Sequence, residues 1–313
     1  MKALIINSGS SSIKYKLFSM PDERLIEKGV IEHIGEAGSK VKDHNQGLGI
    51  ILSKVKEISF LGHRVVHGAE TFSKPVLINQ AVIRKIKQCS LLAPLHNPAN
   101  LAGIMACKKL LPGIKQVAVF DTAFHQTLPE YAYIYGLPYD YYKKYGIRRY
   151  GFHGLSHEYV AHEAAKKLKI RLSKLKIITC HLGNGCSIAA VKQGRSVDTS
   201  MGFTPLEGLV MGTRCGDLDP ALVTHIMRIE KLDLNAMDKI LNKLSGLKGI
   251  SGLSNDMRLL EKKANSGNLR AKLAMNIFIY RIKKYIGAYS AIMAGCDIIV
   301  FTGGIGENQK AAR

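Results

Sequence analysis

Apolar positions change their spacing repeatedly along this chain, and the changes predict short strands that alternate with helices. Apolar runs at 2–6, 13–18, 30–34, 58–67 and 117–120 are typical of strands. Segments 47–55, 97–110 and 268–294 are predicted to be helices, and the last repeats its apolar residues at helical spacing. Asn97 is expected to cap the second helix, with Pro98 at its first position. The alternation predicts a layered α/β protein.

The pattern starts again after residue 121. A helix is expected after Ser156, then strands at 176–180 and 187–191 joined by a turn at 184–185, and a final buried strand at 297–302. In the first half, the polar loop at 8–12 joins the first two predicted strands. Each half therefore has a hairpin with a polar, glycine-containing turn after its first strand. A length of 313 residues also favours more than one domain, and we place the two domains at 1–122 and 123–313.

The composition is that of an ordinary globular protein, with 46% apolar residues and a mean hydropathy of +0.01. No apolar run is long enough for a membrane span, and the first residues read as a strand instead of a signal peptide, so a cytoplasmic location is expected. The 6 cysteines include no Cys-x-x-Cys pair, which favours reduced, packed thiols over disulfides or zinc.

A formal charge of +21 admits two interpretations. Lysines are scattered over most helical segments, which favours diffuse steering of anionic substrates over a nucleic-acid-binding face. The densest cluster, YDYYKKYGIRRY at 139–150, interleaves aromatic and basic residues and could stack on single-stranded nucleic acid. The alternative is a partly buried tyrosine surface. No recognised nucleic-acid-binding motif accompanies the cluster, so nucleic acid is the less favoured partner.

Glycine clusters point to phosphate chemistry. They recur through 181–219 and again at 303–308, and glycine lets backbone N–H groups approach an anion closely. The Asn-Gly pair at 184–185 is also a hairpin signal, and both interpretations can hold together. A Walker P-loop and the protein-kinase motifs are absent, so another architecture must hold the nucleotide.

Charged residues at predicted strand ends and loops complete this set. Arg64 in GHRVVHG can grip a carboxylate or phosphate, or form a surface salt bridge. Asp121 can act as a strand-terminal acid near a metal or as a helix N-cap. His96 and His153 lie in glycine- or proline-containing loops, where a structural role is equally open. With Arg214, these residues supply what phosphoryl transfer needs, which is positive charge and positioning.

Ordered motifs over the chain resemble one family. INSGSSSIKYKLF, GHRVVHGAE, APLHNPAN, VFDTAFHQTLP, YGFHGLSH, HLGNGCS, DTSMGFTPLEGLVMGTRCGDLDP, SGLSNDMR and FTGGIGEN are similar to those of the acetokinase family, within the actin, sugar kinase and heat-shock chaperone superfamily. The resemblance implies two related ribonuclease H-like, actin-like ATPase domains with a nucleotide cleft between them. It also implies that the second domain forms a homodimer interface.

The resemblance further implies reversible, direct in-line phosphoryl transfer from ATP to acetate, giving acetyl phosphate, with Mg²⁺ or alternatively Mn²⁺. By motif, the catalytic residues would be Asp121, His153, Arg214 and Arg64. Acetate would contact Arg64, Val66, Leu95, His96, Phe152 and Pro205. The nucleotide would contact Lys14, His181, Leu182, Gly183, Asn184, Gly185, Asp256, Met257, Arg258, Gly304, Ile305, Gly306, Glu307 and Asn308. Asn7 would be a metal ligand.

The sequence departs from the family pattern in two places, and both bear on whether the chain has kinase activity. The region between Glu32 and Gly62 is shorter than the family pattern. The family also continues through a strand-helix portion with an Asn-Glu-Glu motif whose glutamate is a metal ligand, and we expect that portion to be missing after Arg313. The competing hypothesis is therefore a truncated, catalytically impaired nucleotide-binding remnant. A propionate kinase is a further alternative, since a small methyl pocket discriminates a methylene by only about 1 to 3 kcal/mol.

Overall fold

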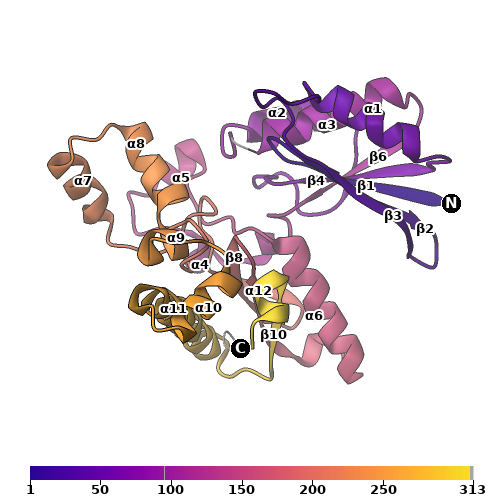
Figure 1. The fold of residues 1–313 in the computed structure, drawn as a ribbon. Coiled ribbons are helices and arrows are strands. Elements are labelled where there is room, and N and C mark those ends of the chain that lie inside the picture. The colour runs from indigo at the N-terminus through magenta and orange to yellow at the C-terminus, as the bar shows by residue number, and fades with distance from the viewer. Residues whose placement is uncertain (95, 311–312) are drawn as a thin grey trace. The chain divides into compact units, whose positions relative to one another are not determined.

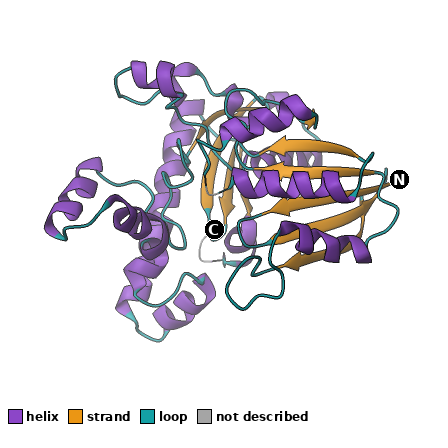
Figure 2. Cartoon of the chain, turned by 90° about the horizontal axis from the view of Figure 1, so that it is seen from above, coloured by secondary structure: helices purple, strands orange, loops and turns teal. Residues whose placement is uncertain are grey.

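The computed structural model describes residues 1–94, 96–310 and 313, and it divides into two compact units (Figure 1). Unit 1 is Met1–Ala123 and unit 2 is Phe124–Arg313. Each unit contains its own sheet, flanked by helices (Figure 2). The α/β class predicted from the sequence is therefore confirmed.

Unit 1 is built on a 6-stranded sheet in the order β3-β2-β1-β4-β6-β5. Its strands are β1 (Lys2–Ser8), β2 (Ile13–Ser19), β3 (Arg24–Ile31), β4 (Phe60–Val65), β5 (Val76–Leu77) and β6 (Lys115–Phe120). Strands β1, β2 and β3 form an antiparallel meander, whereas β1, β4 and β6 run parallel to one another. Three parallel strands thus bring their carboxyl ends to one edge of the sheet, where α/β proteins commonly bind ligands.

The helices of unit 1 pack against this sheet through apolar faces. They are α1 (His44–Lys54), α2 (Gln80–Cys89) and α3 (Asn97–Leu110). Strand β2 alternates buried and exposed residues, so that Ile13, Tyr15 and Leu17 point into a core shared with Leu48 and Ile51 of α1. Burial of these side chains holds α1 and the meander together.

Unit 2 repeats the strand order of unit 1. Its strands are β7 (Lys176–Leu182), β8 (Cys186–Lys192), β9 (Arg195–Thr199) and β10 (Ile298–Thr302). The order β9-β8-β7-β10 matches β3-β2-β1-β4, because in both units an antiparallel meander is followed by a strand parallel to the first. The predicted hairpin is confirmed, with Leu182 paired to Cys186 around the turn at 183–185. The two units are therefore topologically related.

The helices of unit 2 fill the intervals between these strands. They are α4 (Glu130–Tyr133), α5 (Asp140–Tyr145), α6 (Gly154–Leu168), α7 (Pro220–Ile229), α8 (Leu234–Lys239), α9 (Gly246–Ser251), α10 (Met257–Asn265), α11 (Leu269–Met293) and α12 (Gly303–Asn308). The longest, α11, packs on β8 and β7 and ends at Met293, followed by its left-handed C-cap Ala294 and by Gly295. None of the helices in the described residues is long and apolar enough to cross a membrane.

Several boundaries predicted from the sequence were wrong. The strand expected at 30–34 is β3 at 24–31, because pairing with β2 fixes its register. Asn97 is the first residue of α3 instead of its cap, which is His96, since the Asn97 side chain is buried and bonded elsewhere. Strand β10 lies at the edge of its sheet and is partly exposed, with Ile299 41% exposed. The glycine cluster at 303–308, for which no helix was predicted, forms the short helix α12.

Both units contain buried histidines that favour the neutral form. Burial lowers the pKa of His63 and of His67 in unit 1 to about 4. In unit 2 burial lowers the pKa of His125 to about 4 and that of His157 well below its ordinary value. A charged imidazole loses its hydration when buried, which is the cause of each shift.

These histidines predict that the fold loses stability in mild acid. Between about pH 6.5 and 4 the unfolded chain binds more protons than the folded chain, so the free energy of unfolding falls as pH falls. Each histidine contributes at most about 1.4 kcal/mol per pH unit. Urea unfolding midpoints measured across this window should decline, and less so in His63→Asn. The exposed-residue control His225→Asn should keep the wild-type slope. A midpoint that does not change over the window would contradict the prediction.

Candidate active site

Three predicted residues meet at the carboxyl edge of the parallel strands in unit 1. Asn7 is near the end of β1, Arg64 is in β4, and Asp121 directly follows β6. The guanidinium of Arg64 donates to both carboxylate oxygens of Asp121, with Nε 2.9 Å from Oδ1. Its Nη1 also donates to Oδ1 of Asn7 at 3.1 Å. The topology thus unites side chains that lie more than fifty residues apart in sequence.

Burial distinguishes this ion pair from a surface salt bridge. The side chain of Asp121 is 3% exposed and that of Arg64 is 33% exposed. Burial alone would lower the pKa of Arg64, but the charge and hydrogen bonds of Asp121 outweigh it and the pKa is raised. Both oxygens of Asp121 accept from Arg64, which favours its role as a strand-terminal acid over that of a helix N-cap. The partly exposed guanidinium retains an open side toward solvent.

A pair of asparagines on α3 holds the loop after β4; the sequence analysis missed Asn100 and assigned Asn97 a capping role instead. Asn97 accepts from the backbone N–H of His67 at 3.0 Å and donates to its carbonyl at 2.9 Å. Asn100 accepts from the N–H of Val66 at 2.9 Å and donates to the carbonyl of Ser8 at 2.6 Å. Two asparagines three residues apart on the first helical turn share one face, which is the signal that could have revealed them.

The predicted acetate residues of unit 1 lie beside this loop. Val66 is 8% exposed and is fixed by Asn100. His96 is half-buried at the start of α3. Leu95 lies outside the described residues.

In unit 2, His153 and Arg214 converge on the hairpin turn between β7 and β8. A methyl carbon placed on Gly185 would lie 3.4 Å from Nη1 of Arg214 and 3.6 Å from Nε2 of His153. His153 precedes α6 with a left-handed backbone, φ 58°, which is uncommon for a residue with a side chain and is a strain often found at functional sites. A guanidinium N–H and an imidazole nitrogen therefore flank one point above a glycine, an arrangement suited to an anion when the imidazole nitrogen carries a proton.

The remaining residues expected near acetate lie close to these donors in the chain. The carbonyl of Pro205 accepts from Nη1 of Arg214 at 3.1 Å. Phe152, which is 3% exposed, directly precedes His153, and its carbonyl lies 3.1 Å from Nε2 of His125. Buried His125 also contacts the hydroxyl of Ser196 at 2.8 Å, so its role is structural.

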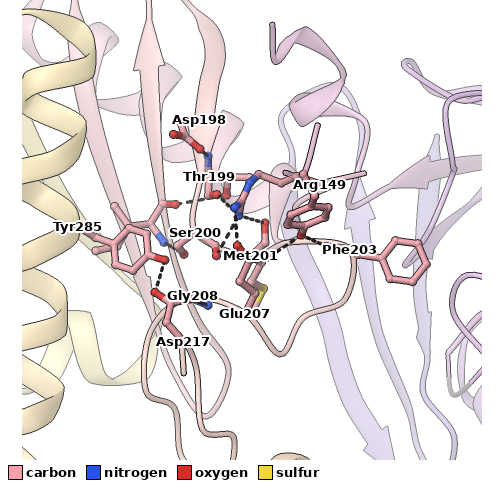
Figure 3. A network of polar contacts seen from close by, with 12 residues as sticks. Arg149, Asp198, Thr199, Ser200, Met201, Phe203, Glu207, Gly208, Asp217 and Tyr285 are labelled. Carbon is pink, nitrogen blue, oxygen red and sulfur yellow. Dashed lines mark hydrogen bonds and ion pairs between the residues drawn. The ribbon is translucent and has the colours of Figure 1, made fainter. Parts of the chain in front are cut away.

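Arg149 anchors the loop that leads to Arg214 (Figure 3). Its Nη1 donates to the carbonyls of Thr199 at 3.0 Å and Met201 at 3.2 Å, and its Nη2 pairs with Glu207. The carbonyl of Ser200 lies 3.4 Å from the same Nη1. Since one side chain ties the start of the loop to its middle, Arg149 is a structural support that the sequence did not reveal.

A second support lies at the far end of the loop. Asp217 accepts from the hydroxyl of Tyr285 in α11 at 2.6 Å and from the N–H of Gly208 at 2.8 Å (Figure 3). Burial, together with the hydrogen bond and charge of Asp217, raises the pKa of Tyr285, so that its hydroxyl remains a donor. Arg214 is thus presented from a loop fixed at both ends.

A cavity of about 590 Å³ lies next to the hairpin turn in unit 2, within the usual range for small-molecule sites. Of the residues predicted to bind nucleotide, the structure brings together Gly183, Asn184, Asp256, Met257, Arg258, Gly304, Ile305 and Asn308 in its lining. Asn255 and Gln309 also line it and were missed. Asn255 donates to Oδ1 of Asn184 at 2.8 Å, which joins two walls of the cavity.

Other predicted nucleotide residues lie outside this lining. Lys14 is exposed on β2 of unit 1. His181 stacks on His153 with ring centroids 4.2 Å apart. Leu182 and Gly306 are buried behind the cavity wall, and Glu307 accepts from the hydroxyl of Thr302 at 3.2 Å. Gly185 faces the two donors described above.

The side-chain oxygens of Asn7 and Asp121 in unit 1 are of the kind that a hard divalent cation binds. Asn7 and Asp121 offer an amide and a carboxylate oxygen at one strand edge. Mg²⁺ in nucleotide enzymes commonly takes one or two protein oxygens and completes its shell with phosphates and water. The described residues contain no cluster of three or more His, Cys, Asp or Glu that could hold a metal alone.

Comparison with known proteins decides the family. A sequence model of the acetokinase family matches residues 40–313. The chain is 56% identical to an acetate kinase of Halothermothrix orenii, covering 100% of this chain and 85% of that protein. It belongs to the acetokinase family. An acetate kinase structure from Porphyromonas gingivalis superposes with a TM-score of 0.96 at 49% identity, covering 100% of this chain and 85% of that one.

A second solved acetokinase relative differs in its named substrate. The structure of a propionate kinase from Francisella tularensis superposes with a TM-score of 0.94 at 43% identity, covering 100% of this chain and 86% of that chain. The Halothermothrix match spans 340 positions against 313 residues here, so that relative has residues within the matched stretch that this chain lacks. The expected shortening between Glu32 and Gly62 stays a prediction.

Membership of the acetokinase family leaves the aromatic and basic cluster at 139–150 to be explained. The guanidinium of Arg148 is buried and lies 3.5 Å from the ring centroid of Tyr133. Arg149 pairs with Glu207, and Tyr150 is 2% exposed. Both arginines therefore stabilise the unit internally, which favours the interpretation as a partly buried tyrosine surface over stacking on nucleic acid.

Substitution of Gly185 by alanine tests the donor pair directly. The backbone of Gly185 is not left-handed, so an alanine fits the fold, but its methyl group would occupy the point between His153 and Arg214. We expect kcat/KM to fall about 100-fold with an unchanged melting temperature, because displacement of a bound group by about 1 Å has that scale of effect. Gly287→Ala, in open space on α11, is the control and should keep full activity. Full activity in Gly185→Ala would contradict the assignment.

Proposed function

We propose that this chain catalyses reversible, ATP-dependent phosphorylation of acetate to acetyl phosphate. The observation that carries the proposal is the convergence of His153 and Arg214 on Gly185, beside the cavity lined by Asn184 and Arg258. A transferring phosphoryl group carries charge on three oxygens, and N–H donors around it lower the barrier. Acetate kinases at more than 50% identity support acetate as the acceptor.

The proposed mechanism assigns the nucleotide to the cavity of unit 2 and the phosphoryl group to His153 and Arg214. Arg214 would neutralise charge on the equatorial oxygens, and His153 would donate a hydrogen bond from Nε2. Because both donors are held in place before the ligand arrives, they need little reorganisation during transfer. Asn184 would transmit nucleotide binding to the Arg214 loop, since its carbonyl accepts from the N–H of Gly212 at 3.0 Å.

The acetate carboxylate is assigned to Arg64, with Val66, Leu95, His96, Phe152 and Pro205 around the acid. Acetate is already ionised at neutral pH, so its oxygen can attack without a base to remove a proton. Asp121 would position Arg64 through its two hydrogen bonds and balance its charge near the reacting oxygens. The work of the protein is positioning and charge stabilisation.

A divalent cation, Mg²⁺ in our proposal, would supply charge neutralisation on the phosphates when bound. Asn7, with Asp121 beside it, would hold the cation through oxygen atoms.

The test is formation of acetyl phosphate by the purified chain. Chain, acetate, ATP and Mg²⁺ are incubated, and acetyl phosphate is trapped as its hydroxamate. We expect product that depends on every component. Nucleotide binding without product would instead support the catalytically impaired remnant. The same assay with propionate in place of acetate decides which acid is preferred. A pocket sized for a methyl group should favour acetate over propionate by about 10- to 200-fold in kcat/KM. The reverse preference would favour the function named for the Francisella relative.

The proposal includes a cytoplasmic homodimer. All 6 cysteines are free, as expected of a reducing compartment that also supplies ATP. Helix α7 has no buried residues, and its Leu222 and Ile229 are 46% and 60% exposed, which supports a contact surface in unit 2. Sedimentation at micromolar concentration would distinguish dimer from monomer.

A further inference from the structure

We propose that Thr179, His157 and Ser187 form a buried hydrogen-bond relay that fixes the tautomer of His153, so that His153 presents a neutral Nε2–H to the phosphoryl group. The three are positioning residues that act through His153. This inference rests on the proposed function for its kinetic consequence, whereas its structural content can be tested independently.

The relay runs inward from His153 through short contacts. Nδ1 of His153 lies 2.9 Å from the hydroxyl of Ser187, and that hydroxyl lies 2.7 Å from Nε2 of His157. Nδ1 of His157 then lies 2.7 Å from the hydroxyl of Thr179. Ser187, His157 and Thr179 are each 0% exposed, so the relay is shielded from water behind the site.

Counting protons leaves two possible directions for the relay. Burial holds the pKa of His157 well below its ordinary value, so this ring is neutral and carries one proton. If that proton is on Nε2, Thr179 donates to His157, His157 to Ser187, and Ser187 to Nδ1 of His153, which uses every short contact. The opposite direction uses the same three contacts and lets the Thr179 hydroxyl donate to the carbonyl of Ala189 at 3.5 Å, at the limit of a hydrogen bond, but it leaves a lone pair on Nε2 of His153. Since a lone pair would repel an anion bound at Gly185, the proposed function requires the first arrangement, with the proton of His153 on Nε2.

The groups around His153 agree with a neutral donor. His181 of β7 stacks on its ring and bonds through Nδ1 to the hydroxyl of Ser156 at 2.9 Å. Arg214 approaches from its loop toward the same point as Nε2 of His153. Cys186, next to Gly185, stays a neutral thiol because burial raises its pKa to about 12. Since Arg214 already supplies positive charge, a neutral Nε2–H adds a hydrogen bond to an anion without a second charge.

The tautomer can be measured without any activity. In the ¹⁵N-labelled chain at about pH 8, two-bond ¹H–¹⁵N correlations of the imidazoles report which nitrogen carries the proton. The His153 signals are assigned by their absence in His153→Gln. We expect the proton on Nε2 in the wild type and a mixture of tautomers in Ser187→Ala. A wild-type proton on Nδ1 would overturn the proposal, whether or not the chain is a kinase.

Kinetics supply the second readout. Without the relay, only the charged ring has Nε2–H in every molecule, so kcat of Ser187→Ala should fall from pH 6 to 8.5 as an imidazole loses its proton, by about twofold if the neutral ring divides evenly between its two tautomers. The KM for acetate should change little. The matched control is Ser196→Ala, which removes a buried serine–histidine bond at His125 and should keep the wild-type profile.

Variants of His157 distinguish the relay from simple packing. His157→Gln can keep an N–H near the Nε2 position and should retain the wild-type pH profile, whereas His157→Leu should lose it. If Ser187→Ala and His157→Leu both keep the profile of the wild type while remaining folded, the relay has no role and the proposal is wrong. Failure of the wild type to form acetyl phosphate would refute only the proposed function.

Discussion

Replacing Arg214 with alanine will lower kcat/KM for acetyl phosphate formation by about 10²- to 10³-fold, the scale of losing one preorganised donor to a developing charge. Arg214 contacts the carbonyl of Pro205 and faces Gly185, and it forms no ion pair among the described residues. Its loop is held instead by Arg149 and Asp217. The variant should therefore fold normally, and steady-state kinetics together with thermal unfolding will separate lost chemistry from lost structure.

The control for this variant is Arg171→Ala, which removes an exposed arginine of the same unit that lies outside α7. It changes the net charge equally, so any loss of substrate steering is common to both variants. Near-normal turnover in Arg214→Ala would remove this loop from the mechanism. An equal loss in both variants would assign the effect to charge alone.

Replacing Arg64 with alanine will reduce both activity and stability. The change leaves the carboxylate of Asp121, 3% exposed, without its partner, and an unpaired buried charge costs about 3 to 5 kcal/mol. We expect the low end of that range because Arg64 itself is one-third exposed. The variant also loses the bidentate hydrogen bonds from Arg64 to the carboxylate of acetate. In the fraction that remains folded, kcat/KM should therefore fall about 10³-fold.

The double variant Arg64→Ala/Asp121→Asn separates the two effects. An amide at position 121 carries no charge, so the double variant should recover most of the lost free energy of unfolding, measured with urea, but no activity. If Arg64→Ala alone were as stable as the wild type, the ion pair between Arg64 and Asp121 would not contribute to the stability of the fold. If the double variant regained turnover, Arg64 would not be needed for the acid.

The sequence was most informative where chemistry depends on local motifs. Strand ends at Arg64 and Asp121 and the glycine turn at Gly185 could be found because apolar runs stop there and polar or glycine residues follow. The α/β class followed from the alternation of elements for the same reason. The roles of these residues in catalysis stay predictions.

The supporting contacts could not be predicted because they join distant segments. Arg149 bonds carbonyls of residues about fifty positions away, and Asn100 reaches the carbonyl of Ser8 over a separation of 92 residues. The spacing of apolar and polar residues along the chain does not indicate which distant residues will form such pairs. Asn97 shows the same limit, since its cap-like position next to Pro98 suggested a local role while the fold uses its side chain for the loop at His67.

The most direct measurement is a crystal structure of the chain with ADP, Mg²⁺, acetate and aluminium fluoride, a mimic of the transferring phosphoryl group. The account predicts that Arg64, Nε2 of His153 and the guanidinium of Arg214 all contact either the fluoride group or the acetate oxygen directed at it, with the nucleotide beside Asn184. A complex in which the fluoride group lies away from His153 and Arg214 would contradict it.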